Sequence, residues 1–213
     1  MSARNEILKS VRRAIGARTE TLPIDRGYIQ AGKLDSQTLE QFRERLEDYN
    51  AGVYRCCTDD MPSMIARAME ARGKRTLLIP PQFPEAWLPS GVEFIRDRDF
   101  TYAQMDAAEG ALTACAVAIS FTGTIILSHA EHEGRRALTL IPDYHLCIVR
   151  ADQVVETVPE GIRKLADSRI RPITTISGPS ATADIEMTRI KGVHGPRTLD
   201  VILVEAQRVN PGK

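Results

Sequence analysis

The sequence predicts an α/β domain with a mostly parallel sheet, preceded by a helical extension. From Gly52 onward, short apolar runs of strand length alternate with segments whose apolar residues recur at helical spacing. This alternation is typical of parallel strands joined by helical crossovers. Hydrophobic residues make up 43% of the 213 residues, enough to form a core without disulfides or metal. We expect the extension over residues 1–50 and the α/β domain over residues 51–213.

Two amphipathic stripes with helical spacing occupy the extension. Their apolar members are Ile7, Leu8, Val11 and Ile15 in the first stripe, and Leu39, Phe42, Leu46 and Tyr49 in the second. A stretch containing Pro and Gly, residues 21–36, separates them. Such stripes pack on a core or on a partner subunit, so a homo-oligomer is one interpretation of them.

The predicted elements of the domain follow in chain order. Strands are expected at residues 52–56, 75–80, 91–96, 144–150 and 200–205, and two more within 111–127 that meet at Thr122-Gly123. Helices are expected at 61–72, with Pro62 in the first turn, and at 159–170. A β-branched run ends at "SGPS" (177–180), after which Ser180 or Thr182 can cap the start of a helix.

Charge and cysteine content exclude several classes of function. Lys plus Arg and Asp plus Glu both number 28, so the chain lacks the basic excess of a nucleic-acid-binding protein. No apolar run approaches the roughly 18 residues of a membrane span, and the N-terminus lacks a signal-peptide core. The cysteines, at positions 56, 57, 115 and 147, form no CxxC motif. We therefore expect a reduced cytoplasmic protein with no metal or cofactor of its own.

Three loops at the ends of predicted strands are candidate ligand sites, because parallel sheets bind ligands at the carboxyl ends of their strands. In the first, Thr122, Gly123 and Thr124 either present donors to an anion or form a plain turn. The second, "SHAEHEGRRA" (128–137), matches neither helical zinc template. A polar loop is the better interpretation of it, although Arg136 suits a carboxylate or a phosphate.

The third loop holds Ser177, Gly178 and Ser180, followed by Asp184 and Glu186. If a helix begins here, the two acids lie in its first turn, where the helix dipole favours them. Their i, i+2 spacing points them to different faces, which favours capping over acid–base catalysis. The free N–H groups of that helix remain an alternative anion site.

Two histidines are candidate proton carriers. His145 begins a predicted strand, and His194 lies in a glycine-flanked loop. An unperturbed imidazole titrates near pH 6.5, so either can act as a general base. A purely structural hydrogen-bonding role is the alternative for both.

Four segments resemble one known family. They are "TGTIIL" (122–127), "GRRALTLIPDYHLCIVRADQVVETVPE" (134–160), "ISGPSATADIE" (176–186) and "GVHGPRTLDVILV" (192–204). In this order and spacing they resemble the lactate utilization protein C family, whose common unit is the LUD domain. The resemblance covers roughly residues 50–205 and rests chiefly on "SGPSATxDIE" followed closely by "GVHGPR".

The resemblance implies a three-layer fold similar to the NagB/RpiA/CoA-transferase group. It implies a part in the oxidation of L-lactate to pyruvate, as an accessory subunit whose iron–sulfur clusters lie in partner proteins. The positions that match the family are Thr122–Thr124, Arg135, Arg136, Pro142, Asp143, His145, Ser177–Ser180, Asp184, Glu186, Gly192 and His194–Pro196.

Two departures from the family pattern bear on the chemistry. Phe121 stands where relatives carry an acid, and "AEHEGRR" (130–136) replaces a Gly-rich loop. The first weakens a proposal of acyl-CoA chemistry, and the second weakens one of phosphate binding.

We therefore expect a small carboxylate or phosphorylated ligand between the Thr122–Thr124 and Ser177–Ser180 loops. Arg136 is its expected charge partner, and His145 or His194 the proton carrier. The alternatives are a free-standing isomerase or CoA-transferase-like enzyme acting on a sugar phosphate or acyl-CoA, and a scaffold protein with a vestigial cleft. Whether the chain is itself an enzyme is left open.

Overall fold

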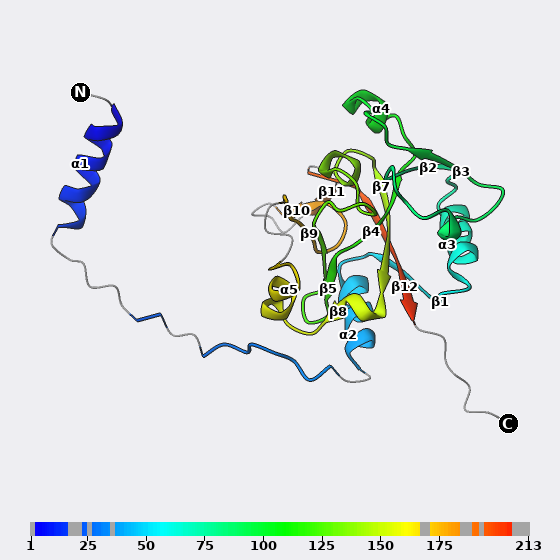
Figure 1. Ribbon diagram of the computed structural model, residues 1–213, viewed down its shortest axis with the longest axis horizontal. Coiled ribbons are helices and arrows are strands. Elements are labelled where there is room, and N and C mark those ends of the chain that lie inside the picture. Colours follow the sequence, from blue (N-terminus) through cyan, green and yellow to red (C-terminus); the bar gives the residue numbers. More distant parts are fainter. Residues whose placement is uncertain are drawn as a thin grey trace.

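A six-stranded sheet in which every neighbouring pair is parallel forms the centre of the computed structural model (Figure 1). The structure describes residues 3–16, 23–24, 27–34, 37–166, 171–183, 189–191 and 194–205. In spatial order the strands are β1 (Gly52–Cys57), β12 (Thr198–Glu205), β7 (Tyr144–Arg150), β4 (Ala111–Ala114), β2 (Thr76–Ile79) and β3 (Glu93–Arg96). The predicted α/β fold with a mostly parallel sheet is confirmed.

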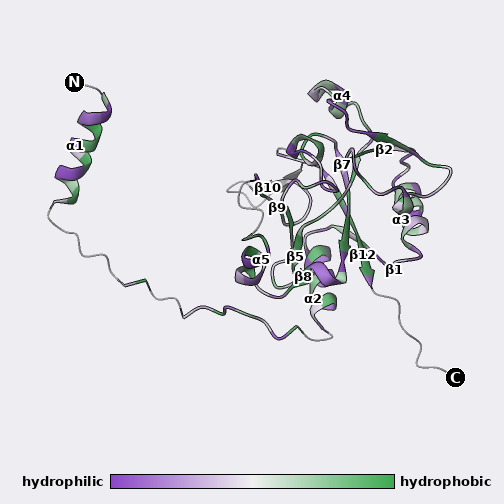
Figure 2. Cartoon of the chain, in the orientation of Figure 1, coloured by the Kyte–Doolittle hydropathy of each residue, from purple (hydrophilic) through white to green (hydrophobic). Residues whose placement is uncertain are grey.

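The central strands are buried on both faces, which is why they are almost continuously apolar in sequence. Along β7, Leu146 and Ile148 join the core on one face, and Cys147 and Val149 join the core on the other. The strands of the sheet are accordingly coloured hydrophobic in Figure 2. Successive side chains of a strand point to opposite faces of the sheet, so alternate residues of β7 belong to the cores on opposite faces.

Helices and a second sheet cover the two faces. Helix α3 (Met61–Ala71) packs Ile65 and Met69 on one face. Helix α2 (Thr38–Asp48) buries Phe42 and Leu46 fully on the other face. The division of the chain after residue 50 stays a prediction, and α2 adds to the core of the domain that follows it.

The second sheet has four strands, in the order β8 (Val154–Val155), β5 (Val117–Ile119), β6 (Thr124–Leu127) and β9 (Thr174–Ile176). Helix α5 (Val158–Lys164) packs against β5. Residues 111–127 therefore form three strands, where two were predicted. The chain leaves the large sheet after β4, and β5 and β6 then pair as an antiparallel hairpin whose turn holds Thr122 and Gly123.

The remaining elements are shorter or peripheral. They are α1 (Ala3–Ile15), α4 (Tyr102–Asp106), β10 (Ala181–Ala183), β11 (Arg189–Lys191) and the 3₁₀ helices η1 (Glu85–Trp87), η2 (Arg136–Thr139) and η3 (Ala151–Gln153). None of the residues of α1 is buried. Within the described ranges, no helix is long and apolar enough to cross a membrane.

The prediction of a helix that begins after Ser180 is wrong for residues 181–183. These residues form β10, which pairs antiparallel with β11. The hydroxyl of Ser180 accepts a hydrogen bond from a different loop, from the backbone N–H of His194 at 3.1 Å. A helix cap and this hydrogen bond compete for the same hydroxyl, and the cross-loop bond is the one formed.

Candidate functional site

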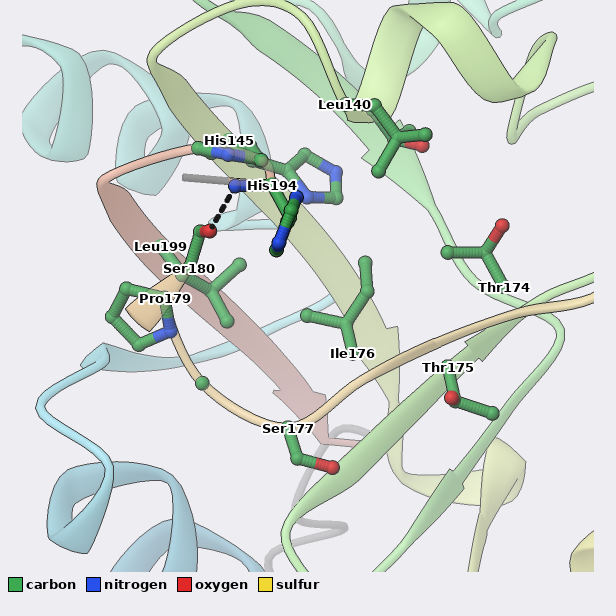
Figure 3. A pocket seen from close by; sticks show the side chains of 14 residues that line it. Leu140, His145, Thr174, Thr175, Ile176, Ser177, Pro179, Ser180, His194 and Leu199 are labelled. Atoms are coloured by element: carbon green, nitrogen blue, oxygen red, sulfur yellow. Dashed lines mark hydrogen bonds between the residues drawn. The ribbon is translucent and has the colours of Figure 1, made fainter. Parts of the chain in front are cut away.

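A cavity of about 230 Å³ lies at the amino ends of β7 and β12 (Figure 3). Its lining comes from η2, β7, β9, the loops after β9 and before β12, and β12 itself. The lining residues are Thr139, Leu140, His145, Thr174–Ser180, His194–Pro196 and Leu199. All three predicted binding residues of the third loop, Ser177, Gly178 and Ser180, line it, and so do both predicted proton carriers.

The location differs from the one expected at the carboxyl ends of the parallel strands. His145 and Leu199 are each the second residue of their strand, so the cavity lies at the amino edge of the large sheet. The cause is the second sheet. Strand β9 pairs antiparallel with β6, and the loop that leaves its carboxyl end lines the cavity together with these two residues.

Two hydrogen bonds hold the loop after β9 against the loop before β12. The N–H of Ser180 donates to the carbonyl of Pro196 at 2.8 Å, and its hydroxyl accepts from His194. Gly178 has a φ of +82°, a conformation that favours glycine, and the turn brings it against Tyr49. This explains locally why a β-branched strand stops at Ser-Gly-Pro-Ser.

Replacing Gly178 with alanine is expected to lower the free energy of unfolding by about 2 kcal/mol. A methyl group there meets the Cβ of Tyr49 at 2.5 Å, in addition to the strain of the positive φ. Gly91→Ala is the matched control, because Gly91 has a φ of +81° and no atom within 4 Å of a built Cβ. The control should lose only about 1 kcal/mol in urea unfolding, and equal losses would contradict the contact with Tyr49.

His145 is 1% exposed, and its Nε2 lies 2.9 Å from the hydroxyl of Thr113 on β4. Burial lowers the pKa of His145 to about 4. The imidazole is therefore neutral at pH 7 and can accept a proton only at a considerable cost in free energy. His194, by contrast, is exposed at the mouth of the cavity.

The first predicted loop reaches the third through a chain of hydroxyls. Thr122 Oγ1 lies 2.7 Å from Thr124 Oγ1, which lies 2.8 Å from Ser177 Oγ. The two loops thus meet as predicted, but Thr122, Gly123 and Thr124 do not line the cavity. Their hydroxyls bind each other and Ser177, which ties the β5–β6 turn to the loop after β9.

The two arginines after Gly134 differ in their surroundings. Arg135 binds the buried carboxylate of Asp97 through two hydrogen bonds of 2.7 and 2.9 Å, so it is a structural cation. Arg136 is exposed and forms no ion pair with any described residue. It lies three residues before the lining residue Thr139 in η2, where positions i and i+3 share a face. Among the described residues Arg136 therefore has no ionic partner, and it lies near the cavity in sequence without lining it.

Several lining residues lie outside the predicted set. Thr139, Leu140, Thr174 and Leu199 belong to segments that read as ordinary core or strand sequence. Only the tertiary fold brings them to the cavity. Asp184 and Glu186 lie outside the described residues. No group of three metal-ligating side chains occurs within the described part of the chain.

The lining of the cavity combines polar and apolar side chains. Among the described lining residues the polar side chains are two imidazoles and several hydroxyls, with no carboxylate or thiol. Such a wall can hydrogen-bond a small polar molecule, and Arg136 can add attraction for an anion.

Comparison with known proteins identifies close relatives. The family model described as the LUD domain matches residues 39–204. A Deinococcus radiodurans protein named lactate utilization protein C is 45% identical over 95% of both chains. An Exiguobacterium protein of the same name is 25% identical over 94% of this chain and 95% of its own. The crystal structure of a DUF162 family protein from Deinococcus radiodurans matches with a TM-score of 0.68 and 41% identity, covering 85% of this chain and 99% of that one.

Proposed function

The chain belongs to the LUD domain family, and we propose that it takes part in the utilization of L-lactate. The observation that carries this proposal is the 45% identity, over 95% of both chains, to a protein named for lactate utilization. Three further relatives with that name, from different genera, support it.

In the finer form of the proposal, the chain is an accessory subunit of an iron–sulfur system that oxidises L-lactate to pyruvate in the cytoplasm. The four cysteines are free, and two of them are buried, which fits a reducing compartment. The clusters belong to the partner proteins.

The cavity at the amino ends of β7 and β12 is the proposed ligand site. A small carboxylate fits its chemistry, because hydroxyl and imidazole groups line it and Arg136, which has no ionic partner among the described residues, lies in η2 three residues before the lining residue Thr139. The buried His145 stays neutral at pH 7, so it supplies a hydrogen bond to the ligand and not a charge. His194, which is exposed, is the better proton carrier of the two.

A deletion strain without a second copy of the gene is expected to stop growing on L-lactate and to keep growing on pyruvate. The reason is that only the step between the two compounds is removed. A plasmid carrying the intact gene should restore growth, and normal growth of the deletion strain on lactate would contradict the pathway assignment. Affinity purification of the tagged chain, under anaerobic conditions, tests the finer proposal by asking whether iron-containing proteins are retained.

Ligand class is tested by thermal unfolding in the presence of L-lactate, acyl-CoA or sugar phosphates. A ligand at one hundred times its dissociation constant adds about 2.7 kcal/mol of stability. Stabilisation by acyl-CoA or a sugar phosphate, and not by lactate, would favour the isomerase or CoA-transferase alternative.

A further inference from the structure

The loop before η2 contains a histidine, His129, that contacts a lining residue of the cavity without lining the cavity itself. His129 Nε2 lies 2.8 Å from the hydroxyl of Thr174, a lining residue on β9. His129 Nδ1 lies 3.0 Å from the carbonyl oxygen of Gly134. One imidazole therefore bridges the loop that leads into η2 and the strand β9, and of these two segments β9 lines the cavity.

The backbone of His129 is held in a conformation that few non-glycine residues adopt. Its φ is +56°. The buried carboxylate of Glu133 stabilises this turn, because it accepts hydrogen bonds from the backbone N–H of His129, at 2.9 Å, and from that of Ser128. The ring of His129 is thus fixed at both its backbone and its side chain.

The partners of the ring determine the direction of each hydrogen bond. A carbonyl oxygen can only accept, so Nδ1 carries the proton and donates to Gly134. In the neutral imidazole the other nitrogen then accepts. The hydroxyl of Thr174 must therefore donate its single proton to His129 Nε2.

This bond fixes which substituent of Thr174 faces the cavity. In Figure 3 the hydroxyl oxygen of Thr174 points away from the cavity, and its methyl group points inward. Leu140 and Ile176 lie on the same side of the view, with His145, His194 and Ser180 opposite. The methyl group of Thr174, Leu140 and Ile176 thus form an apolar part of the lining, here called the apolar wall. His145, His194 and Ser180, with Leu199 and Pro179 beside them, lie across from it and are here called the polar wall.

We propose that His129 is a positioning residue, which holds the methyl group of Thr174 in the apolar wall and so selects a ligand with a short aliphatic side chain. The inference rests on the proposed function, in which the ligand is a small carboxylate. The polar wall then takes the carboxylate and the oxygen at carbon 2, and the apolar wall takes the methyl group of a three-carbon acid. L-Lactate and glycolate, which differ by that methyl group, are the probes.

The test compares the affinity of the full chain for L-lactate and glycolate by calorimetry at pH 8. Burial of one methyl group corresponds to about a fourfold preference for L-lactate. Thr174→Ser keeps the hydroxyl and removes the methyl group, so the preference should disappear. Thr174→Val keeps a methyl group toward the ligand, so the ratio of affinities should remain while the bond to His129 is lost. His129→Asn tolerates the positive φ but has a side chain too short to reach Thr174, and it should reduce the preference.

A spectroscopic measurement on the ligand-free protein separates the two proposals. The ¹⁵N shifts of His129 should report the Nδ1–H tautomer in the wild type and in both Thr174 variants, because the carbonyl of Gly134 accepts the Nδ1 proton in all three. An Nε2–H tautomer in the wild type, or a preference retained by Thr174→Ser, would overturn the positioning role. If the wild type binds neither acid but shows the Nδ1–H tautomer, the assigned ligand is wrong, and the proposed selection for an aliphatic side chain falls with it.

Discussion

Replacing Arg72 with alanine is expected to lower the free energy of unfolding by about 2–3 kcal/mol, less than for a fully buried pair because 39% of the Arg72 side chain is exposed. Arg72 follows the end of α3 and binds Asp200 of β12 through two hydrogen bonds, of 2.8 and 2.6 Å. The carboxylate of Asp200 is fully buried, and its other described partner is the hydroxyl of Tyr144 at 3.1 Å. Without the guanidinium, a charge remains in the interior with one neutral donor. Urea unfolding of both proteins measures the difference.

The surroundings of the pair support a large effect. The hydrogen bond to Asp200 raises the pKa of Arg72. The pKa of the Tyr144 hydroxyl is also raised, mainly by burial and secondly by the negative charge of Asp200. The double variant Arg72→Ala/Asp200→Asn is the control, since it removes the unpaired charge as well. It should be more stable than Arg72→Ala alone. A loss of less than about 1 kcal/mol for Arg72→Ala would contradict this prediction, because it would equal the small contribution of an ion pair on the protein surface.

Stability is expected to fall by about 3 kcal/mol between pH 7 and pH 4 because of His145 alone. In the folded protein its pKa is about 4, against an ordinary value of 6.5. Between these two pH values the unfolded chain binds a proton that the folded protein does not, so acid favours unfolding. The contribution is fully present above pH 6.5 and is lost as the pH falls toward 4.

The variant His145→Gln isolates this effect from the other titrating groups. Glutamine can still hydrogen-bond the hydroxyl of Thr113, but it does not titrate. We expect the variant to be less stable than the wild type at pH 7, and the gap between them to narrow by about 3 kcal/mol at pH 4. A gap that is constant across this range, measured by urea unfolding at four or more pH values, would show that His145 is not buried as a neutral base.

Much of the fold was predictable because the central strands β7 and β12 are long and buried on both faces. The runs at 144–150 and 200–205 contain the uninterrupted apolar stretches 146–149 and 201–204, and they form β7 and part of β12. The helix predicted at 61–72 is present as α3, with Pro62 in its first turn. Each of these elements is stabilised by its own local pattern and by the core, so local sequence and tertiary structure agree.

The second sheet was missed because its strands have two to four residues each, which is too short for a periodic signal. Its absence from the prediction also misplaced the site. Sequence patterns indicated strand ends, but they did not indicate that β9 is antiparallel to β6, and this pairing places the Ser177–Ser180 loop at the amino edge of the large sheet. Ser180 likewise matched a helix cap, yet its hydroxyl binds a loop that is close only in the folded protein.

The residues of the candidate site likewise fall into a group that the sequence predicted and a group that it did not. Ser177, Gly178, Ser180, His145 and His194 were predicted from turn chemistry and residue type, and all line the cavity. Its apolar members gave no signal, because leucine and isoleucine are the ordinary residues of any core. Hydroxyl pairs such as Thr124 and Ser177 depend on distances that only the fold sets.

The position of β12 has a consequence for how the chain is made. This strand lies between β1 and β7 and is the sole sheet neighbour of β1 among the described strands, with Gly52 opposite Asp200. During translation, β1 leaves the ribosome long before its partner does. Its backbone hydrogen-bonding groups then have no strand to pair with for most of synthesis, and an unpaired edge of this kind attracts other chains. Pairing of β1 with β12 is therefore a late, long-range step of folding.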